Sequence, residues 1–260
     1  NARWGGGRFL HRKPLLAFNA TLTVHDDLPD YVRHGVFARS QNYPAVVRLS
    51  NGSVDIQANT KPDIRGFAMR ILGVTGSAAS GGQTDHQDFL LINHDVCDAK
   101  DSTEFMELAV AVARGGELGV LAFLLRRYGL RDGLARIRRT LRTLTKPFRG
   151  YNAERFTTAA PHANGPYAFK LRLTPKFPRS RTNRDHARDM IQQLQSGPIA
   201  YDLALQFFVD EESTPIEKPR ITWSDEISPT VSVATLTLSS IGNAEQVEQL
   251  TFDPWGGLMA

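Results

Sequence analysis

Runs of alternating apolar and polar side chains constrain the fold of this chain more than any other feature. Side chains alternate at period two in residues 167–173 and again in 201–207, as they do in strands with one buried face. In residues 231–238 the apolar positions shift from odd to even numbers after Val233, which predicts a β-bulge. Four more short apolar runs are bounded by Gly, Asn, Asp or Pro, as strands often are. These runs lie at residues 18–24, 45–50, 66–72 and 89–92.

Helical periodicity separates these groups of strands. Residues 102–114 and 118–144 carry apolar side chains three and four positions apart, and so do residues 183–195, which Gly197-Pro198 follows. Because the helices form blocks between antiparallel strands, this order predicts an α+β protein built on a closed antiparallel barrel. No repeat with a period of about 20 to 50 residues is visible. We expect a single domain over residues 1–260.

Composition excludes several classes of protein. Hydrophobic residues make up 41% and charged residues 22% of the chain, which excludes a disordered or collagen-like protein. Cys97 is the single cysteine, so an intrachain disulfide and a cysteine-based zinc cluster are excluded, and a cytoplasmic location is favoured. The longest apolar run, residues 120–125, is far shorter than the roughly 20 residues of a membrane span. We therefore expect no membrane crossing.

Positive charge is concentrated in one segment. From Arg126 to Arg149 there are nine Lys or Arg and one acid, Asp132, in a chain whose net charge is +4. A solvated helix packed on the barrel and a helix that binds a membrane surface are both compatible with this segment. Nucleic acid is not an expected partner, because the segment lacks the regular aromatic residues of a base-stacking interface.

The N-terminal segment carries the first specific motif. Arg8, Phe9, Leu10 and His11 are followed by Phe18, seven positions after the histidine. This pattern resembles the catalase family and its shorter relatives, the catalase-like peroxidases and allene oxide synthases. The resemblance implies a catalase-like antiparallel β-barrel with helical insertions that binds haem b. It also implies that His11 is the catalytic acid and base and that Arg8 contacts a haem propionate.

Two further segments extend the resemblance. Arg48 and Ser50 are similar to a propionate-binding arginine and to the serine that orients the histidine. Asn93, at the end of an apolar strand, is similar to the second distal residue, which steadies the peroxide. Phe105, four residues after Asp101, is similar to the phenylalanine that stacks on haem.

The remaining matches are structural or incomplete. Residues 63–68 resemble a family signature that we expect to be structural, and residues 252–255 resemble the family's Phe-Asp-Pro-Trp stretch. Asp95, Cys97 and Asp98 depart from the family pattern, which changes the expected lining near the distal asparagine.

The chemistry of haem supports these assignments independently. Buried propionates need cations and hydrogen-bond donors, a task that suits the guanidinium groups of Arg8 and Arg48. A neutral histidine such as His11 can take a proton from a peroxide and return it to the leaving oxygen. The Asn93 amide can hold that oxygen by a hydrogen bond.

The proximal iron ligand of catalases is a tyrosine. In the short relatives an Arg-x-x-x-Tyr helix follows the Phe-Asp-Pro-Trp stretch. The single Arg-x-x-x-Tyr of this chain, residues 39–43, precedes the Arg48 strand instead. The resemblance therefore leaves two alternatives: the proximal tyrosine lies beyond Ala260, on a C-terminal helix that residues 1–260 lack, or this member of the family has lost its metal ligand.

Several functions stay open at this point. The favoured one is a haem-dependent oxidoreductase acting on hydrogen peroxide or on an organic or fatty-acid hydroperoxide, and Leu10 favours this chemistry over allene oxide formation. A second is a haem-free module that binds a lipid surface or a protein partner. A third is a non-haem metal hydrolase. The resemblance also implies self-association into a homo-oligomer. The candidate ligands of the third function are Asp85, His86, Asp88, His94 and Asp95.

Overall fold

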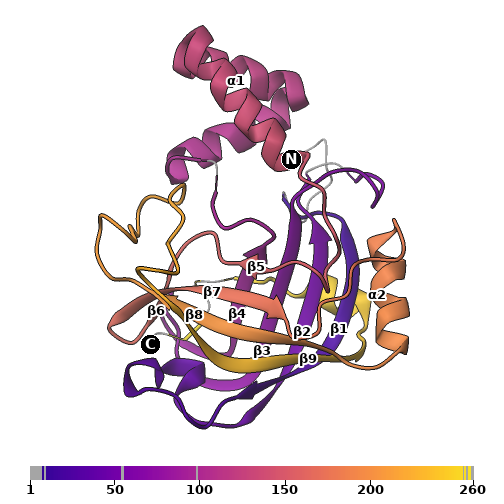
Figure 1. Ribbon diagram of the computed structural model, residues 1–260, viewed down its shortest axis with the longest axis vertical. Helices are drawn as coiled ribbons and strands as arrows, with labels where there is room; N and C mark the ends of the chain where they lie inside the picture. Colours follow the sequence, from indigo (N-terminus) through magenta and orange to yellow (C-terminus); the bar gives the residue numbers. More distant parts are fainter. Residues whose placement is uncertain are drawn as a thin grey trace.

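Eight antiparallel strands close into a barrel in the computed structural model (Figure 1). The structure describes residue 8, residues 10–53, 56–97 and 99–253, and residues 255, 257 and 258. The ring closes because β5 pairs with both β4 and β7, and β6 pairs only with β7. The strands are β1 (Pro14–Val24), β2 (Asn42–Asn51), β3 (Arg65–Ser77), β4 (Gln83–Ile92), β5 (Phe156–Thr157), β6 (His162–Asn164), β7 (Tyr167–Pro175), β8 (Ile199–Phe207) and β9 (Thr230–Ile241).

Three helices and two short turns complete the fold. The helices are α1 (Ser102–Leu144), α2 (His186–Gln195) and α3 (Ala244–Gln249), and the 3₁₀ turns are η1 (Asp30–Val32) and η2 (Gly35–Phe37). The predicted α+β architecture, a closed antiparallel barrel with helical insertions, is confirmed.

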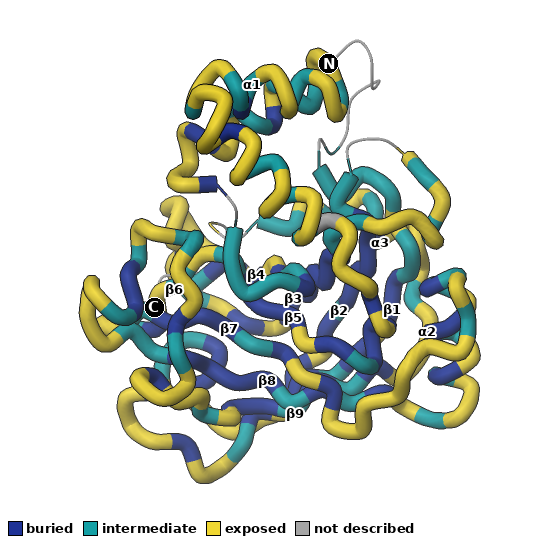
Figure 2. Tube along the Cα trace, turned by 45° about the horizontal axis from the view of Figure 1, so that its top comes forward, coloured by how far each residue is buried: buried dark blue, intermediate teal, exposed yellow. Residues whose placement is uncertain are grey.

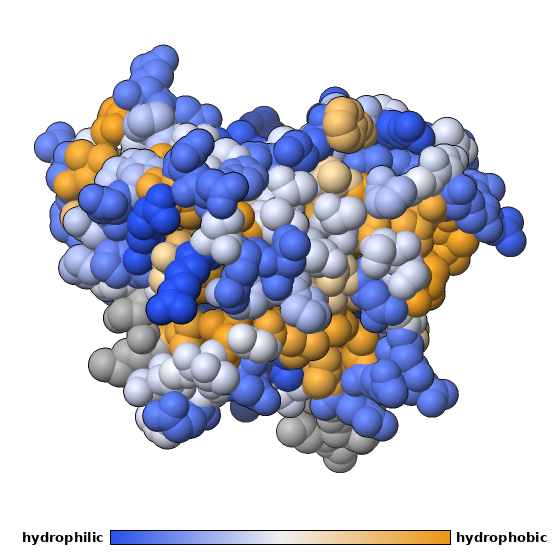
Figure 3. All heavy atoms as spheres, turned by 90° about the horizontal axis from the view of Figure 1, so that it is seen from below, coloured by the Kyte–Doolittle hydropathy of each residue, from blue (hydrophilic) through white to orange (hydrophobic). Residues whose placement is uncertain are grey.

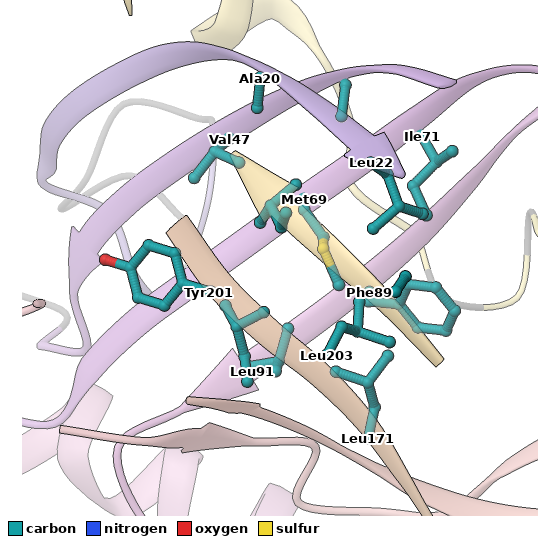
Figure 4. Close-up of a cluster of buried hydrophobic side chains, with 14 of the residues drawn as sticks. Ala20, Leu22, Val47, Met69, Ile71, Phe89, Leu91, Leu171, Tyr201 and Leu203 are labelled. Atoms are coloured by element: carbon teal, nitrogen blue, oxygen red, sulfur yellow. The ribbon is translucent and has the colours of Figure 1, made fainter. Parts of the chain in front are cut away.

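The barrel interior is filled by alternate side chains of each strand. Along β8, Tyr201, Leu203 and Leu205 are fully buried, as the period-two pattern predicts. Their neighbours in the core include Met69 and Phe89 (Figure 4). Residues of opposite parity on the same strands therefore face outward, where a site can be built.

The predicted bulge in β9 is present. Leu203 pairs with Ala234, but the next residue of β8, Ala204, pairs with Ser232. Val233 is therefore the extra residue, and it is fully buried. This insertion lets Val233 and the even-numbered Leu236 face the same core.

Helix α1 differs from the expectation of two separate helices. The backbone continues through residues 115–117, but Gly116 and Gly129 have non-helical angles, with φ of 56° and 72°. The break predicted between 114 and 118 therefore exists as a sharp kink at Gly116. The helix projects from the barrel (Figure 1), and most of its residues are exposed or half-buried (Figure 2).

Run length alone underestimated how apolar this helix is. An 18-residue window within Ser102–Thr143 has a mean hydropathy of 1.8, and 6% of that window is buried. By length and composition the helix qualifies as a candidate membrane span. The sequence analysis missed it because single polar residues and glycines interrupt the apolar runs.

A buried ion pair anchors the C-terminal segment to the outside of β3 and β4. Arg70 donates to both carboxylate oxygens of Asp88, at 2.7 and 2.6 Å, and Asp88 is completely buried. The Asp253 N–H donates to the same carboxylate at 2.8 Å, and the Arg70 guanidinium lies 5.5 Å from the Phe252 ring. The Phe-Asp part of the 252–255 motif is thus held against the barrel wall.

Candidate active site

His11 lies just before β1 and is held by backbone and side-chain contacts. Its N–H donates to the Gly52 carbonyl at 3.1 Å, and its Nδ1 lies 3.0 Å from Ser50 Oγ. Among the described residues other than glycine, His11 alone has a positive φ, 52°. A left-handed backbone costs roughly 1–2 kcal/mol for such a residue, so the surrounding contacts hold this imidazole in a conformation that the chain would not choose locally.

Strand register puts a glycine directly against the imidazole. Ser50, Gly66 and Ile92 are direct neighbours across β2, β3 and β4. A Cβ on Gly66 would lie 2.5 Å from His11 Nδ1 and 2.6 Å from Ser50 Oγ. Gly66 was expected to be purely structural, but it creates the space that the imidazole occupies.

The surroundings keep His11 neutral. Burial, together with the smaller effect of the nearby Arg48 charge, lowers the pKa of His11 to about 4. When Nδ1–H donates to Ser50 Oγ, the lone pair of Nε2 is available, and no described residue hydrogen-bonds to Nε2. The arrangement is that of an oriented base whose accepting nitrogen is uncommitted.

The two arginines expected to bind propionates converge on one carboxylate. Arg8 Nη1 lies 2.8 Å from Glu248 Oε2, and Arg48 Nη2 lies 3.3 Å from the same oxygen while Arg48 Nε bonds Oε1. Arg48 Nη2 also donates to the His11 carbonyl at 2.9 Å. Arg48 is 3% exposed, so its charge needs this partner.

Glu248 was missed by the sequence analysis. It lies in α3, 240 residues from Arg8 and 200 from Arg48. Its one sequence signal is position, in a short polar helix directly before the Phe252 motif. Burial and the neighbouring Arg48 charge lower the pKa of Arg8, whereas Glu248 opposes this shift. The carboxylate thus allows two guanidinium groups to lie side by side.

Asn93 directly follows Ile92, the last residue of β4 and the cross-strand neighbour of Gly66. Its Oδ1 accepts a hydrogen bond from the Arg65 N–H at 2.7 Å, and its own N–H donates to the Arg65 carbonyl at 3.1 Å. Since only the amide oxygen can accept, this bond fixes the orientation of the amide. Nδ2 makes no hydrogen bond with any described residue, so it is left as a donor.

Phe105 is not tied to this cluster. It lies on the first turn of α1, is 39% exposed and forms no ring contact with another described residue. The structure therefore brings His11, Ser50, Arg8 and Arg48 into one connected network. Asn93 lies next to this network, because it follows Ile92, which pairs with Gly66. Phe105 lies outside it.

The departures from the family pattern near Asn93 have local roles. Asp95 accepts from Arg155 Nε at 3.1 Å, and the Cys97 N–H donates to the Pro219 carbonyl at 3.0 Å. Asp98 lies outside the described residues. These contacts stabilise the loop between β4 and α1.

The alternative metal site is not formed. Among the described residues, no three His, Cys, Asp or Glu side chains gather in a way that could hold a metal ion. His86 pairs with Asp85 at 2.7 Å, while the Asp88 carboxylate is taken by Arg70 and the Asp95 carboxylate by Arg155. The prediction of a non-haem metal hydrolase at these residues is therefore wrong.

The tyrosines of the chain are all described, and their hydroxyls are committed elsewhere or lie in other parts of the fold. Tyr43 is a buried residue near the opposite end of β2 from Ser50. The Tyr151 hydroxyl donates to the Ser50 carbonyl at 3.0 Å, and burial raises its pKa. Tyr201 donates to the Tyr151 carbonyl at 3.2 Å, and Tyr128 bonds Glu104 in α1. Neither the motif at residues 39–43 nor these side chains present a tyrosinate to His11.

Comparison with solved structures identifies the architecture. A bacterial catalase superposes with a TM-score of 0.72 at 16% sequence identity, covering 96% of this chain and 52% of the catalase. The chain has a catalase-like fold. A fungal catalase matches equally well, at 16% identity over 97% of this chain and 54% of its own, and catalase A from Saccharomyces cerevisiae matches at 14% identity over 97% and 56%. No protein-family model and no curated protein sequence matches the chain.

The catalase-like chain spans about half the length of these catalases. The residues around His11 are of the chemical kinds that would meet one face of a haem. On the outer face of the barrel, the small residues Gly66 and Ala68 lie between β2 and β4. His11 and Asn93 offer an uncommitted nitrogen each, and two arginines lie beside them. Hydrogen-bonding groups and cations are therefore present beside His11.

Proposed function

We propose that this catalase-like chain forms the distal half of a haem pocket and processes peroxides. The observation that carries the proposal is His11, which is neutral, anchored on Ser50, seated against Gly66 and held at a positive φ. A half-buried, strained and oriented imidazole with an uncommitted nitrogen is typical of a catalytic base.

His11 acts first as a base and then as an acid. Its Nε2 accepts the proton of the bound hydroperoxide O–H, and it returns that proton to the other oxygen as the O–O bond breaks, so that water or an alcohol leaves. Ser50 orients the ring throughout this transfer, and Asn93 Nδ2 donates a hydrogen bond to the peroxide. Haem, when bound, would supply the redox chemistry of O–O cleavage.

Haem b would be held by residues that already form a network. Arg8 and Arg48 would meet the propionates, and Glu248 would keep their guanidinium groups in place from the other side. Phe105, the expected stacking residue, is 39% exposed and lies outside this network.

We further propose that the proximal ligand is a tyrosine in chain beyond residue 260. The six tyrosines of residues 1–260 are engaged or placed elsewhere, so a seventh must supply the bond to iron. On this view residues 1–260 form one catalase-like domain whose haem pocket is completed by a following helix.

The substrate is hydrogen peroxide or an organic hydroperoxide, including one carried on a lipid. We expect the protein to self-associate, as the resemblance implies. A haem-free module that binds a lipid surface or a protein partner is the second candidate. It is favoured by Glu248, which already forms ion pairs with both arginines without any added anion.

An absorption spectrum tests the proposal. The natural full-length protein is purified with haem supplied, and its spectrum is recorded before and after peroxide is added. We expect a strong Soret band that peroxide shifts, and we expect His11→Asn to abolish at least 99% of peroxide consumption while the band is retained.

A matched histidine serves as the control. His25 follows β1, and its Nε2 lies 3.2 Å from Thr235 Oγ1, away from the arginine pair. We expect His25→Asn to keep full peroxide consumption. If no Soret band forms despite haem supply, the enzyme proposal is lost and the haem-free module replaces it.

A further inference from the structure

Glycines fold α1 into three short helical segments. Gly116 and Gly129 turn the chain with positive φ, and they divide α1 into residues 102–115, 117–128 and 130–144. Each segment is about 20 Å long at 1.5 Å per residue, shorter than the roughly 30 Å hydrocarbon core of a bilayer. No single segment can span a membrane, although the composition of the whole helix resembles that of a span.

Two more glycines let the segments pack against each other. A Cβ on Gly119 would lie 2.3 Å from the Ala111 carbonyl oxygen, and a Cβ on Gly133 would lie 3.0 Å from that of Leu124. Each turn glycine is thus followed within four residues by a glycine at a segment crossing. The sequence specifies a folded helical insert instead of a straight rod.

The insert exposes large apolar side chains that the barrel does not cover. Leu118 is 77% exposed, Leu130 73% and Met106 60%. Such exposure in one element of a soluble surface marks an interaction site. The other exposed large apolar residues of α1 are Phe105, Val110, Leu121, Leu134 and Leu141.

The same segment carries the excess positive charge of the chain. Residues 102–149 contain ten Lys or Arg and four Asp or Glu, a net charge of +6, so the rest of the chain, whose total is +4, carries −2. The opposite face of the molecule also has an apolar strip (Figure 3). What distinguishes α1 is apolar exposure together with a concentrated positive charge, which complements an anionic lipid surface.

The first two segments enclose a groove of about 980 Å³. Its walls include the apolar side chains of Met106, Val110 and Phe123. The charged residues that line it are three arginines and one acid, Arg114, Arg126, Arg127 and Glu107, and the acid pairs with Arg127 at 3.6 Å. An apolar trough with guanidinium groups matches an acyl chain that ends in an anionic headgroup.

We propose that α1 docks the protein on the surface of an anionic phospholipid bilayer. The exposed leucines enter the acyl boundary, the arginines meet headgroup phosphates, and the groove accepts an acyl chain. Docking of this kind lies in the plane of the membrane, as segment length requires. It does not depend on haem, so it can fail or hold separately from the peroxide chemistry.

Vesicle sedimentation tests the docking. The full chain is mixed with vesicles of phosphatidylcholine alone, or with vesicles in which about 30% of the lipid is the anionic phosphatidylglycerol. We expect at least tenfold stronger binding to the anionic vesicles, and we expect this preference to be lost in roughly 1 M salt, where the screening length falls to about 3 Å.

Paired variants separate the insert from the rest of the surface. We expect L118E/L130E and R138E/R142E each to weaken binding to anionic vesicles at least tenfold, because the first pair loses apolar insertion and the second reverses two charges. The matched controls are F177E, at a residue 72% exposed outside α1, and R179E/R184E, at exposed arginines outside α1. We expect both controls to bind as the wild type does.

Three outcomes overturn the proposal. One is equal binding to both vesicle types, a second is no binding to either, and a third is equal loss in the control variants. Sedimentation velocity without vesicles checks for self-association through α1. If the wild type does not bind vesicles and L118E/L130E converts a dimer to a monomer, the exposed surface of α1 binds a second copy of the chain instead of a membrane.

Discussion

The barrel and α1 use apolar residues in opposite ways. In the barrel, alternate side chains such as Leu203 and Leu236 are fully buried, and charged partners such as Asp88 are buried in pairs. In α1, Leu118 and Leu130 lie mostly in solvent, and the Arg127–Glu107 pair at 3.6 Å is about half exposed. Apolar side chains therefore stabilise the barrel by being buried, whereas those of α1 remain exposed as a surface for binding.

This contrast also separates two kinds of strain. Around His11, hydrogen bonds hold an unfavourable backbone conformation at the proposed catalytic site. In α1, positive φ occurs at Gly116 and Gly129, where it costs little. The barrel can hold a strained residue because its contacts over-determine the position, whereas the insert relies on glycine to make its turns.

Breaking an ion pair is expected to give the largest difference between the barrel and α1 in the free energy of unfolding. Arg70→Met leaves the Asp88 carboxylate buried without its partner, so we expect about 3–5 kcal/mol less free energy of unfolding. Arg127→Met removes the half-exposed pair in α1, and we expect a loss of about 0–1 kcal/mol. Urea denaturation of both variants measures the difference, and similar losses would contradict the contrast.

Truncating leucines gives the next largest difference. Leu203→Ala opens a cavity in the barrel core, so we expect about 2–5 kcal/mol less free energy of unfolding. Leu130→Ala removes a side chain that is 73% exposed, and we expect a change within about 0.5 kcal/mol. Denaturation under the same conditions compares the pair. A large effect of Leu130→Ala would show that α1 is part of the cooperative core.

Acid sharpens the contrast further, because the histidines with lowered pKa values all lie outside α1. Burial lowers the pKa values of His11, His162 and His186 to about 4, whereas α1 contains no histidine. In the unfolded chain these groups bind protons below about pH 6.5. Stability is therefore full above pH 6.5 and is lost as the pH falls toward 4.

A single substitution measures how much one of these histidines contributes to the pH dependence of stability. His162 packs against Phe89 and Phe169, and we expect His162→Gln to reduce the loss of stability between pH 6.5 and 4 by about 2–3 kcal/mol. Denaturation midpoints over this range provide the measurement. An unchanged slope would mean that His162 titrates as it does in the unfolded chain. Vesicle binding by α1 should not follow this profile, because no titrating histidine lies in the insert.

Much of the barrel could be predicted from local patterns. Period-two alternation placed Tyr201, Leu203 and Leu205 in the core, and a change of parity located the bulge at Val233. Resemblance to the catalase family selected His11, Ser50, Arg8 and Arg48, which the structure brings into one network. Local patterns suffice here because strand alternation and motif spacing are properties of neighbouring residues.

Other parts of the site came only from tertiary structure. Gly66 reaches His11 through strand register, and Glu248 joins Arg48 across 200 residues of chain. The spacing of residues along the sequence does not predict these two contacts, because they depend on which strands become neighbours when the barrel closes.

The sequence by itself determined an α+β chain, its strand faces, the distal motif and the concentration of positive charge. Tertiary structure decided which outward-facing residues meet at His11 and that α1 stands away from the core with its leucines uncovered. The physical reason is that burial is a property of the closed barrel as a whole: the same leucine stabilises a protein or exposes a binding surface according to what the rest of the chain places over it.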